Sequence, residues 1–157
     1  MWLPSTAWAW SARIRAGWRR GSGRTAPPTP TWPGGVIAAL TVAAERAMAA
    51  GVSPDRIVID PAHDFGKNTW HSLELTRRTA DLAATGWPVL VAVSNKDFVG
   101  EALDVGIAER GEGTLAVLAI CAWEGARLFR VHDVAAAREA LAAVTRLRAE
   151  PSALSPG

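Results

Sequence analysis

Three stretches of this sequence decide its fold: RIVIDPAHDFGK at residues 56–67, PVLVAVSNKDF at residues 88–98 and ARLFRVHDV at residues 126–134. In each, a short apolar run typical of a buried strand ends abruptly in charged or polar residues. Helices between such runs indicate parallel strands, because a parallel crossover is usually helical. Parallel strands deliver the residues that follow them to one edge of the sheet. The pattern therefore predicts an α/β fold with a site at that edge.

Helical periodicity fills the gaps between the strands. One helix is expected from Val36 to the stop at Gly51, and a second from about residue 70 to 84, capped by Asn68 or Thr69. The strands are expected at 56–60, 88–93 and 126–131. A third helix, reached through residues 94–106, has an apolar interior at 115–123, and a last helix begins after Asp133. This order is one helix followed by three βα units, which both an open doubly wound sheet and a (β/α) barrel accommodate.

The charges divide the chain in two. Residues 1–44 hold five of the 17 Lys and Arg residues and none of the 15 Asp and Glu residues. The formal charge of +2 therefore belongs to the beginning of the chain, and the remainder is net negative. This distribution argues against a nucleic-acid-binding domain in the folded part.

The first 35 residues differ from the rest in composition. Five of the eight tryptophans lie there among Gly, Pro, Ser and Arg, and no period of a helix or strand fits them. We expect residues 1–35 to be a disordered tail or an out-of-frame translation, residues 36–150 to be the folded domain, and residues 151–157 to be a second disordered tail. A basic, aromatic tail that binds single-stranded nucleic acid is the alternative for residues 1–35.

Two observations concern the location of the chain. The apolar run at 115–123 falls far short of the roughly twenty residues of a membrane span, so we expect a buried helix and no membrane partner. The single cysteine, Cys121, lies inside that run and offers neither a disulfide nor a thiolate metal site. No secretory signal is recognisable, and a cytoplasmic location is expected.

Three motifs resemble one family. IDPAHDFGK (59–67), SNKDFVG (94–100) and RVHDV (130–134) are similar, in order and spacing, to the family forms DPGxGFGK, SRKxxxG and RVHDV of dihydropteroate synthase. The resemblance covers roughly residues 36–150. It implies a partial (β/α)8 TIM barrel, consisting of the last three βα units and one preceding helix.

The resemblance also implies a set of functions. The family condenses a dihydropterin pyrophosphate with p-aminobenzoate, with magnesium on the leaving group. Asp60, Lys96 and Arg130 would bind the pterin, and Arg130 and His132 would bind the pyrophosphate. Phe65, Ser94 and Asn95 would line the pocket for the aromatic amine. The family's magnesium ligand and its first five strands have no counterpart here, so no metal residue is assigned.

The departures from the family forms change the expected function. Ala62 and Asp64 stand where the first motif has glycines, and Asp64 adds a negative charge where an anion should bind. His63 and Asp64 are adjacent on a loop and make a poor metal site without further ligands. Asn95 replaces the arginine of the second motif. These changes resemble a divergent branch of the family in which synthase activity is doubtful, so the sequence predicts a pterin-binding protein without catalysis.

Two other functions are consistent with the same residues. The helix at 113–124 could pair with a second copy of the chain or with a full-length paralogue, which would make the chain an interaction module. A generic phosphate-binding α/β domain is the other possibility, although no Walker or Rossmann glycine loop supports it.

Overall fold

The computed structural model describes residues 10–12 and 34–149. The disorder expected for residues 1–9, 13–33 and 151–157 concerns residues that lie outside this described part of the chain. Within it, no helix is both long enough and apolar enough to cross a membrane.

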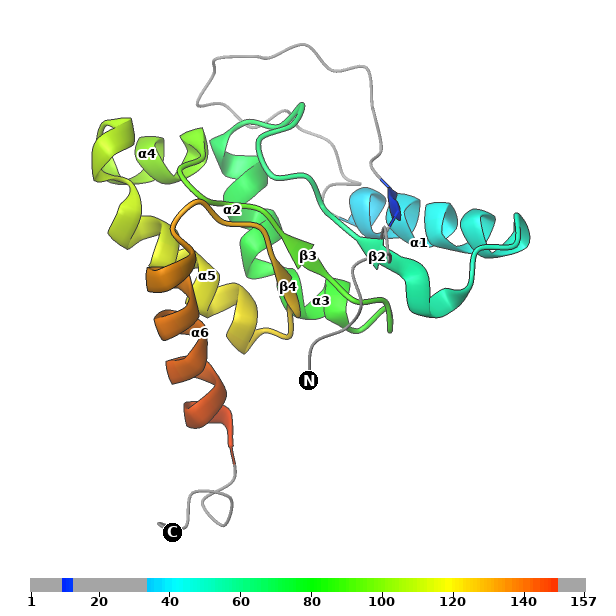
Figure 1. The fold of residues 1–157 in the computed structure, drawn as a ribbon. Coiled ribbons are helices and arrows are strands. Elements are labelled where there is room, and N and C mark those ends of the chain that lie inside the picture. The colour runs from blue at the N-terminus through cyan, green and yellow to red at the C-terminus, as the bar shows by residue number, and fades with distance from the viewer. Residues whose placement is uncertain (1–9, 13–33, 150–157) are drawn as a thin grey trace, which may run out of the picture.

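The described residues form an α/β fold of short parallel strands and six α-helices (Figure 1). In chain order the elements are β1 (Trp10–Ala12), α1 (Gly34–Ala49), β2 (Ile57–Ile59), α2 (Thr69–Arg77), α3 (Thr79–Ala83), β3 (Leu90–Val91), α4 (Asp97–Leu103), α5 (Gly111–Trp123), β4 (Leu128–Phe129) and α6 (Val134–Arg148). Single 3-10 turns at Pro54–Arg56 and Ile107–Glu109 lead into β2 and α5. The α/β class predicted from the sequence is therefore confirmed.

All strand pairs of the described chain are parallel. β3 pairs with β4, with Leu90 opposite Leu128, and a bridge from Ile59 to Val89 connects β2 to this pair. The amide of Ile59 also donates to the carbonyl of Pro88 over 2.9 Å. β2, β3 and β4 consequently lie side by side in the order of the sequence, as Figure 1 shows at the centre of the molecule. Each strand is shorter than its apolar run, because the hydrogen-bonded pairing stops where the chain turns into the loops.

β1 was not expected, since no strand period fits the sequence around Trp10. The structure pairs it in parallel with β2, with Trp10 opposite Ile57 and Ala12 opposite Ile59. A backbone segment can complete the hydrogen bonds of an unpaired strand edge whatever its own side-chain pattern, which is why periodicity does not reveal it.

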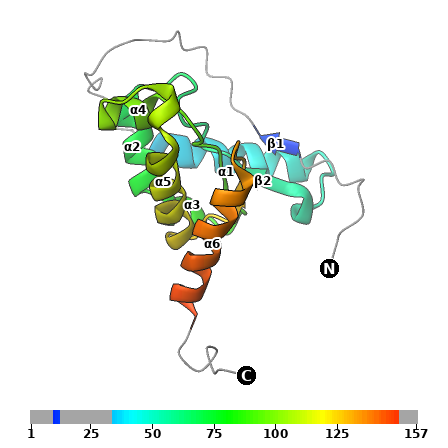
Figure 2. The same cartoon turned by 60° about the vertical axis from the view of Figure 1, so that its left-hand side comes forward.

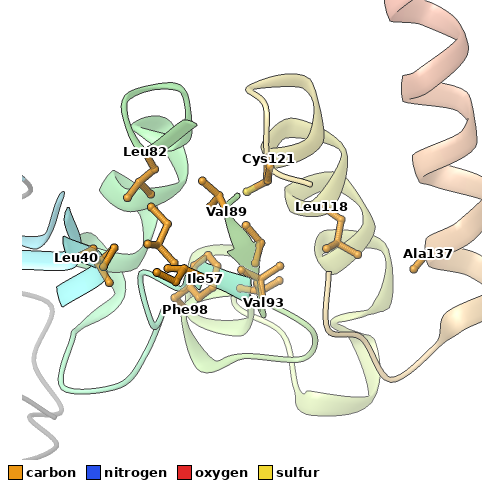
Figure 3. Packing of buried hydrophobic residues seen from close by; sticks show 14 residues of the cluster. Leu40, Ile57, Leu82, Val89, Val93, Phe98, Leu118, Cys121 and Ala137 are labelled. Atoms are coloured by element: carbon orange, nitrogen blue, oxygen red, sulfur yellow. The ribbon is translucent and has the colours of Figure 1, made fainter. Parts of the chain in front are cut away.

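The core joins the strands to the helices. Val89 and Val93 lie between Leu82 of α3 on one side and Leu118 and Cys121 of α5 on the other (Figure 3). The whole cluster is almost fully shielded from solvent, and further members are Leu40 of α1, Phe98 of α4 and Ala137 of α6. Burying such side chains is worth roughly 1.5–3 kcal/mol each for the larger ones, before the loss of chain entropy is counted.

Both predicted helix caps are present, but one predicted helix is divided and one helix was not predicted. The side chain of Asn68 accepts from the amide of His71 over 3.0 Å, and that of Asp133 accepts from Ala136 over 3.0 Å. The single helix expected at 70–84 is divided at Arg78 into α2 and α3. α4 was missed altogether, because seven residues that include Gly100 provide neither a helical period nor a high propensity.

α5 buries only one of its faces within the chain. Thr114, Leu118 and Cys121 are buried, whereas Ile120 and Trp123 are 50% and 52% exposed. α6 packs along α5, as Figure 2 shows from the side. The sequence predicts burial all round, and nothing in the described part of the single chain covers the face with Ile120 and Trp123.

Candidate functional site

The parallel pairing brings the predicted residues to one edge of the sheet. Asp60 directly follows β2, and Arg130 directly follows β4. Lys96 lies at the end of the turn after β3, as the residue before α4. The three charges are close enough to interact: the negative charge of Asp60 raises the pKa of Lys96, and the positive charge of Arg130 lowers it. We call this edge, with Asp60, Lys96 and Arg130, the mouth.

Asp60 is buried, and one of its two carboxylate oxygens accepts a hydrogen bond. Its Oδ1 accepts from the amide of Ala62 over 2.8 Å, which fixes the turn that follows β2. Its Oδ2 makes no hydrogen bond within the described residues. A buried carboxylate oxygen in this position can accept from the N–H groups of a ligand.

Lys96 lies in the middle of the mouth. Its Nζ donates to the carbonyl of His63 and lies 4.8 Å from the centroid of the Phe65 ring, within cation–π range. Burial lowers the pKa of Lys96 to about 8, and the positive charges of Arg130 and Lys67 contribute to that shift. The carboxylates of Asp64 and Asp60 oppose it.

Lys67 closes the loop between β2 and α2, a role that the sequence analysis did not assign. Its Nζ donates to the carbonyls of Ala62 over 3.0 Å and Phe65 over 3.2 Å. Burial lowers the pKa of Lys67, and Asp60 and Asp64 act against that effect. The lysine of the motif therefore holds the loop together and adds a second cation to the mouth.

The loop has a backbone shape that favours glycine. Ala62, Asp64 and Gly66 have φ values of 55°, 64° and 65°, in the left-handed region. The first two are the positions at which the family form has glycine, and a Cβ there costs roughly 1–2 kcal/mol. Aspartate tolerates this conformation better than alanine, because its side chain can hydrogen-bond locally.

Asp64 is held by three hydrogen bonds that the sequence did not reveal. Its amide donates to Ser72 Oγ over 3.0 Å, and the same hydroxyl donates to Asp64 Oδ1 over 3.0 Å. Its Oδ2 accepts from the amide of Phe98, in the first turn of α4, over 3.3 Å. The carboxylate thereby connects the loop to α2 and to α4.

His63 points away from the mouth into the core. Its ring stacks on Phe98 with centroids 5.7 Å apart, and only 1% of the residue is exposed. Nε2 lies 3.4 Å from Thr76 Oγ1, and Nδ1 is buried without a hydrogen-bond partner. Burial, assisted by Lys96 and Lys67, lowers the pKa of His63 to about 3. The side chains of His63 and Asp64 thus diverge, and they form no joint metal site.

The three residues predicted for an aromatic-amine pocket, Phe65, Ser94 and Asn95, have different surroundings. Phe65 is 54% exposed beside Lys96. Ser94 Oγ instead contacts His132, lying 2.9 Å from Nδ1 and accepting from the amide over 3.3 Å. Asn95 has φ 54°, and its amide donates to Thr114 Oγ1 over 3.1 Å. Ser94 therefore orients His132, and the backbone of Asn95 is anchored to α5.

Arg110 was also missed by the sequence analysis. Its Nη1 donates to the carbonyl of Asn95 over 2.9 Å and forms an ion pair with Asp97 over 3.0 Å. It lies so close to Gly100 that a Cβ there would come within 2.3 Å of Nε. A side chain at position 100 would therefore displace the Arg110 guanidinium from these contacts, and no local pattern marks Arg110 as a neighbour of Gly100.

The fold is that of a parallel α/β protein whose predicted site residues gather at the carboxyl ends of its strands. A family model described as pterin binding enzyme matches residues 32–132. The chain therefore belongs to the pterin-binding enzyme family, which confirms the family predicted from the three motifs.

Similar proteins place the chain within this family. The inactive dihydropteroate synthase 2 of Mycobacterium tuberculosis is 60% identical over 113 residues, which are 72% of this chain and 36% of that protein. The predicted resemblance to the divergent branch is thus confirmed. The chain spans little more than a third of that relative.

Solved structures support the partial barrel. Dihydropteroate synthase of Xanthomonas albilineans with 4-aminobenzoic acid matches with a TM-score of 0.75 at 33% identity, over 80% of this chain and 46% of the other. The enzyme of Thermus thermophilus in complex with 6HMPPP matches with a TM-score of 0.69 at 42% identity, over 74% of this chain and 46% of the other. The chain thus corresponds to less than half of each of these structures.

Proposed function

We propose that this chain binds a pterin at the mouth and does not catalyse the condensation that its family is known for. The observation that carries the proposal is the charge arrangement around Lys96. A buried carboxylate from the end of β2 and an arginine from the end of β4 both act on this lysine. A carboxylate beside two cations suits a heterocycle that has N–H donors on one edge and a carbonyl on another.

Each residue has a distinct part in the proposed binding. Asp60 Oδ2 would accept from the amino-pyrimidine edge of the pterin, and Lys96 would donate to its carbonyl after releasing the carbonyl of His63. Arg130 would lie across the ring face, where a planar guanidinium is suited to stacking. His132, oriented by Ser94, would contact a polar substituent.

The absence of catalysis is proposed on two grounds. The relative from Mycobacterium tuberculosis that is 60% identical over 113 residues is named inactive. Here Ser94 is bonded to His132 and the arginine of the second motif is Asn95. The proposed amine pocket therefore offers an aromatic amine few polar partners.

Magnesium does not fit the residues of the mouth. The described residues contain no group of three His, Cys, Asp or Glu side chains that could hold a metal ion. Asp60 and Asp64 each act on Lys67 and Lys96, whose ammonium groups would repel a divalent cation.

A binding titration tests the proposal. The purified chain is titrated into a pterin while the quenching of pterin fluorescence is followed, for the natural chain and for Arg130→Ala. We expect Arg130→Ala to weaken binding about tenfold or more, since a charge-assisted contact is lost. Arg127→Ala, at the other end of β4, is the matched control and should bind as the natural chain does.

A product assay with dihydropterin pyrophosphate, p-aminobenzoate and magnesium completes the test. We expect no condensation product above the background without protein. Steady product formation would contradict the non-catalytic part, and equal binding by Arg130→Ala and the natural chain would contradict the site.

A further inference from the structure

Asp64 is a fixed negative charge at the mouth. Two of its contacts hold the carboxylate itself, Oδ1 through the Ser72 hydroxyl at 3.0 Å and Oδ2 through the Phe98 amide at 3.3 Å. A third holds its backbone, from the Asp64 amide to Ser72 Oγ. The carboxylate therefore cannot swing away from an incoming ligand without losing hydrogen bonds to both α2 and α4.

The same carboxylate acts on the cations of the mouth. Lys96 Nζ donates to the carbonyl of His63, next to Asp64, and Lys67 Nζ donates to the carbonyls of Ala62 and Phe65 on either side of it. The negative charge of Asp64 favours the protonated form of both lysines, against the burial that lowers the pKa of each. Lys67, Lys96 and Arg130 thus share the mouth with two carboxylates, Asp60 and Asp64. With glycine at position 64, the same three cations would face Asp60 alone, and the mouth would be more positive by one charge.

The added charge affects ligands unequally. A multiply charged pyrophosphate group needs the positive potential that Asp64 reduces. An uncharged pterin ring is held by a hydrogen bond that Asp60 accepts and one that Lys96 donates, and these contacts depend much less on the net charge of the mouth than the binding of an anion does. Asp64 therefore penalises the ester of pyrophosphate more than the free pterin alcohol.

We infer that Asp64 determines the ligand specificity of the mouth, so that it takes an uncharged pterin alcohol in preference to the pyrophosphate ester. This inference rests on the proposed function, because it specifies which pterin binds at that site. It assigns Asp64 a role in specificity, and it does not make Asp64 a catalytic residue.

The test compares two ligands on three chains. The dissociation constants of 6-hydroxymethylpterin and of its pyrophosphate ester are measured, without metal, on the natural chain, on Asp64→Asn and on Asp104→Asn. Asparagine keeps a hydrogen-bond acceptor and tolerates the left-handed backbone, so Asp64→Asn removes mainly the charge. Asp104 has φ 56° at the end of α4, and Asp104→Asn is therefore a control with the same change in the same backbone conformation.

We expect the natural chain to bind the alcohol at least as tightly as the ester. Asp64→Asn should shift the ratio of the two dissociation constants about tenfold toward the ester, the order expected when a unit charge beside a multiply charged anion is removed. The affinity for the alcohol should change much less, and Asp104→Asn should leave the ratio unchanged.

Three results would overturn the inference, and they are distinguishable. If Asp64→Asn weakens both ligands equally, Asp64 only holds the loop in place. If Asp64→Asn binds both ligands with the affinities of the natural chain, only the inference on specificity fails. If neither ligand binds to the natural chain, the proposed function fails and the inference fails with it.

Discussion

His63 is a polar residue that the fold accommodates as an apolar one. It stacks on Phe98 in the core and leaves Nδ1 without a partner. A buried imidazole in that state is stable only when it is neutral, since a charged ring would be desolvated beside Lys96 and Lys67. The residue therefore couples the stability of the site loop to pH.

The sign of this coupling follows from the lowered pKa. The pKa of His63 falls from 6.5 to about 3 on folding, so between these values the unfolded chain binds a proton that the folded chain does not. Stability must then fall as the pH falls from about 6.5, by up to roughly 1.4 kcal/mol per pH unit for this one group.

His63→Phe tests the coupling. Phenylalanine can keep the stacking on Phe98 but cannot be protonated, so the variant should lose less stability than the natural chain between about pH 6.5 and about pH 4.5. Urea unfolding at several pH values measures the difference, in which contributions of other titrating groups cancel. Parallel pH profiles for the two chains would show that His63 does not carry the effect.

At the scale of elements, the packing of α4 on α5 depends on a glycine. A Cβ at Gly113 would lie 2.5 Å from Leu103 Cδ1 and 2.8 Å from Val99 Cγ1, both on α4. Gly111, two residues earlier in α5, has nothing within 4 Å of its Cβ position. Gly113 thus allows α4 and α5 to approach closely, whereas Gly111 has no part in that contact.

The two alanine substitutions should consequently differ in their effect on the free energy of unfolding. Alanine normally stabilises a helix by about 1 kcal/mol relative to glycine, so Gly111→Ala should be neutral or slightly stabilising. Gly113→Ala should destabilise the chain by about 1–3 kcal/mol, because the side chains of Leu103 and of the buried Val99 must shift. Chemical unfolding of both variants measures this. A stabilising Gly113→Ala would mean that α4 is not packed on α5 as described.

The same elements show how far the sequence predicts the structure. The strands that precede Asp60 and Arg130 and the cap at Asp133 follow from local patterns, because periodicity and capping involve residues close in sequence. α4 and β1 do not, since α4 is stabilised by its packing on α2 and α5 and β1 by pairing with β2. A short element of this kind has too few residues to carry a period of its own.

The site was predictable to a similar degree. The order of the strands and their parallel direction bring Asp60, Lys96 and Arg130 to one edge, and this requires no knowledge of side-chain directions. The contacts of Ser94 with His132 and of Asp64 with Phe98 join residues far apart in the sequence. Such pairings depend on rotamers and loop shape, which a single sequence does not specify.

At the scale of the whole molecule, the sheet has an open edge at β4. Within the described residues, β4 pairs only with β3, and Leu128 on it is 36% exposed. A cavity of about 580 Å³ lies beside this strand between α5 and α6, lined mainly by apolar side chains that include Phe129, Leu141 and Val144. Parallel sheets are normally covered on both faces, and an uncovered apolar edge favours association with another chain.

We therefore expect the 157-residue chain to self-associate through β4 as its concentration rises. Leu128→Lys should reduce this association severalfold, because a charged side chain on an edge strand opposes strand pairing. Leu147→Lys is the matched control: Leu147 is 73% exposed on α6 and is not among the residues that line the cavity beside β4, so its substitution should leave association unchanged. Sedimentation velocity over a range of concentrations, with circular dichroism to verify folding, measures both. If the two variants associate as strongly as the natural chain, the edge of β4 is not the surface through which copies associate. If the association of both variants is weakened equally, general surface hydrophobicity drives it and the strand edge has no special part.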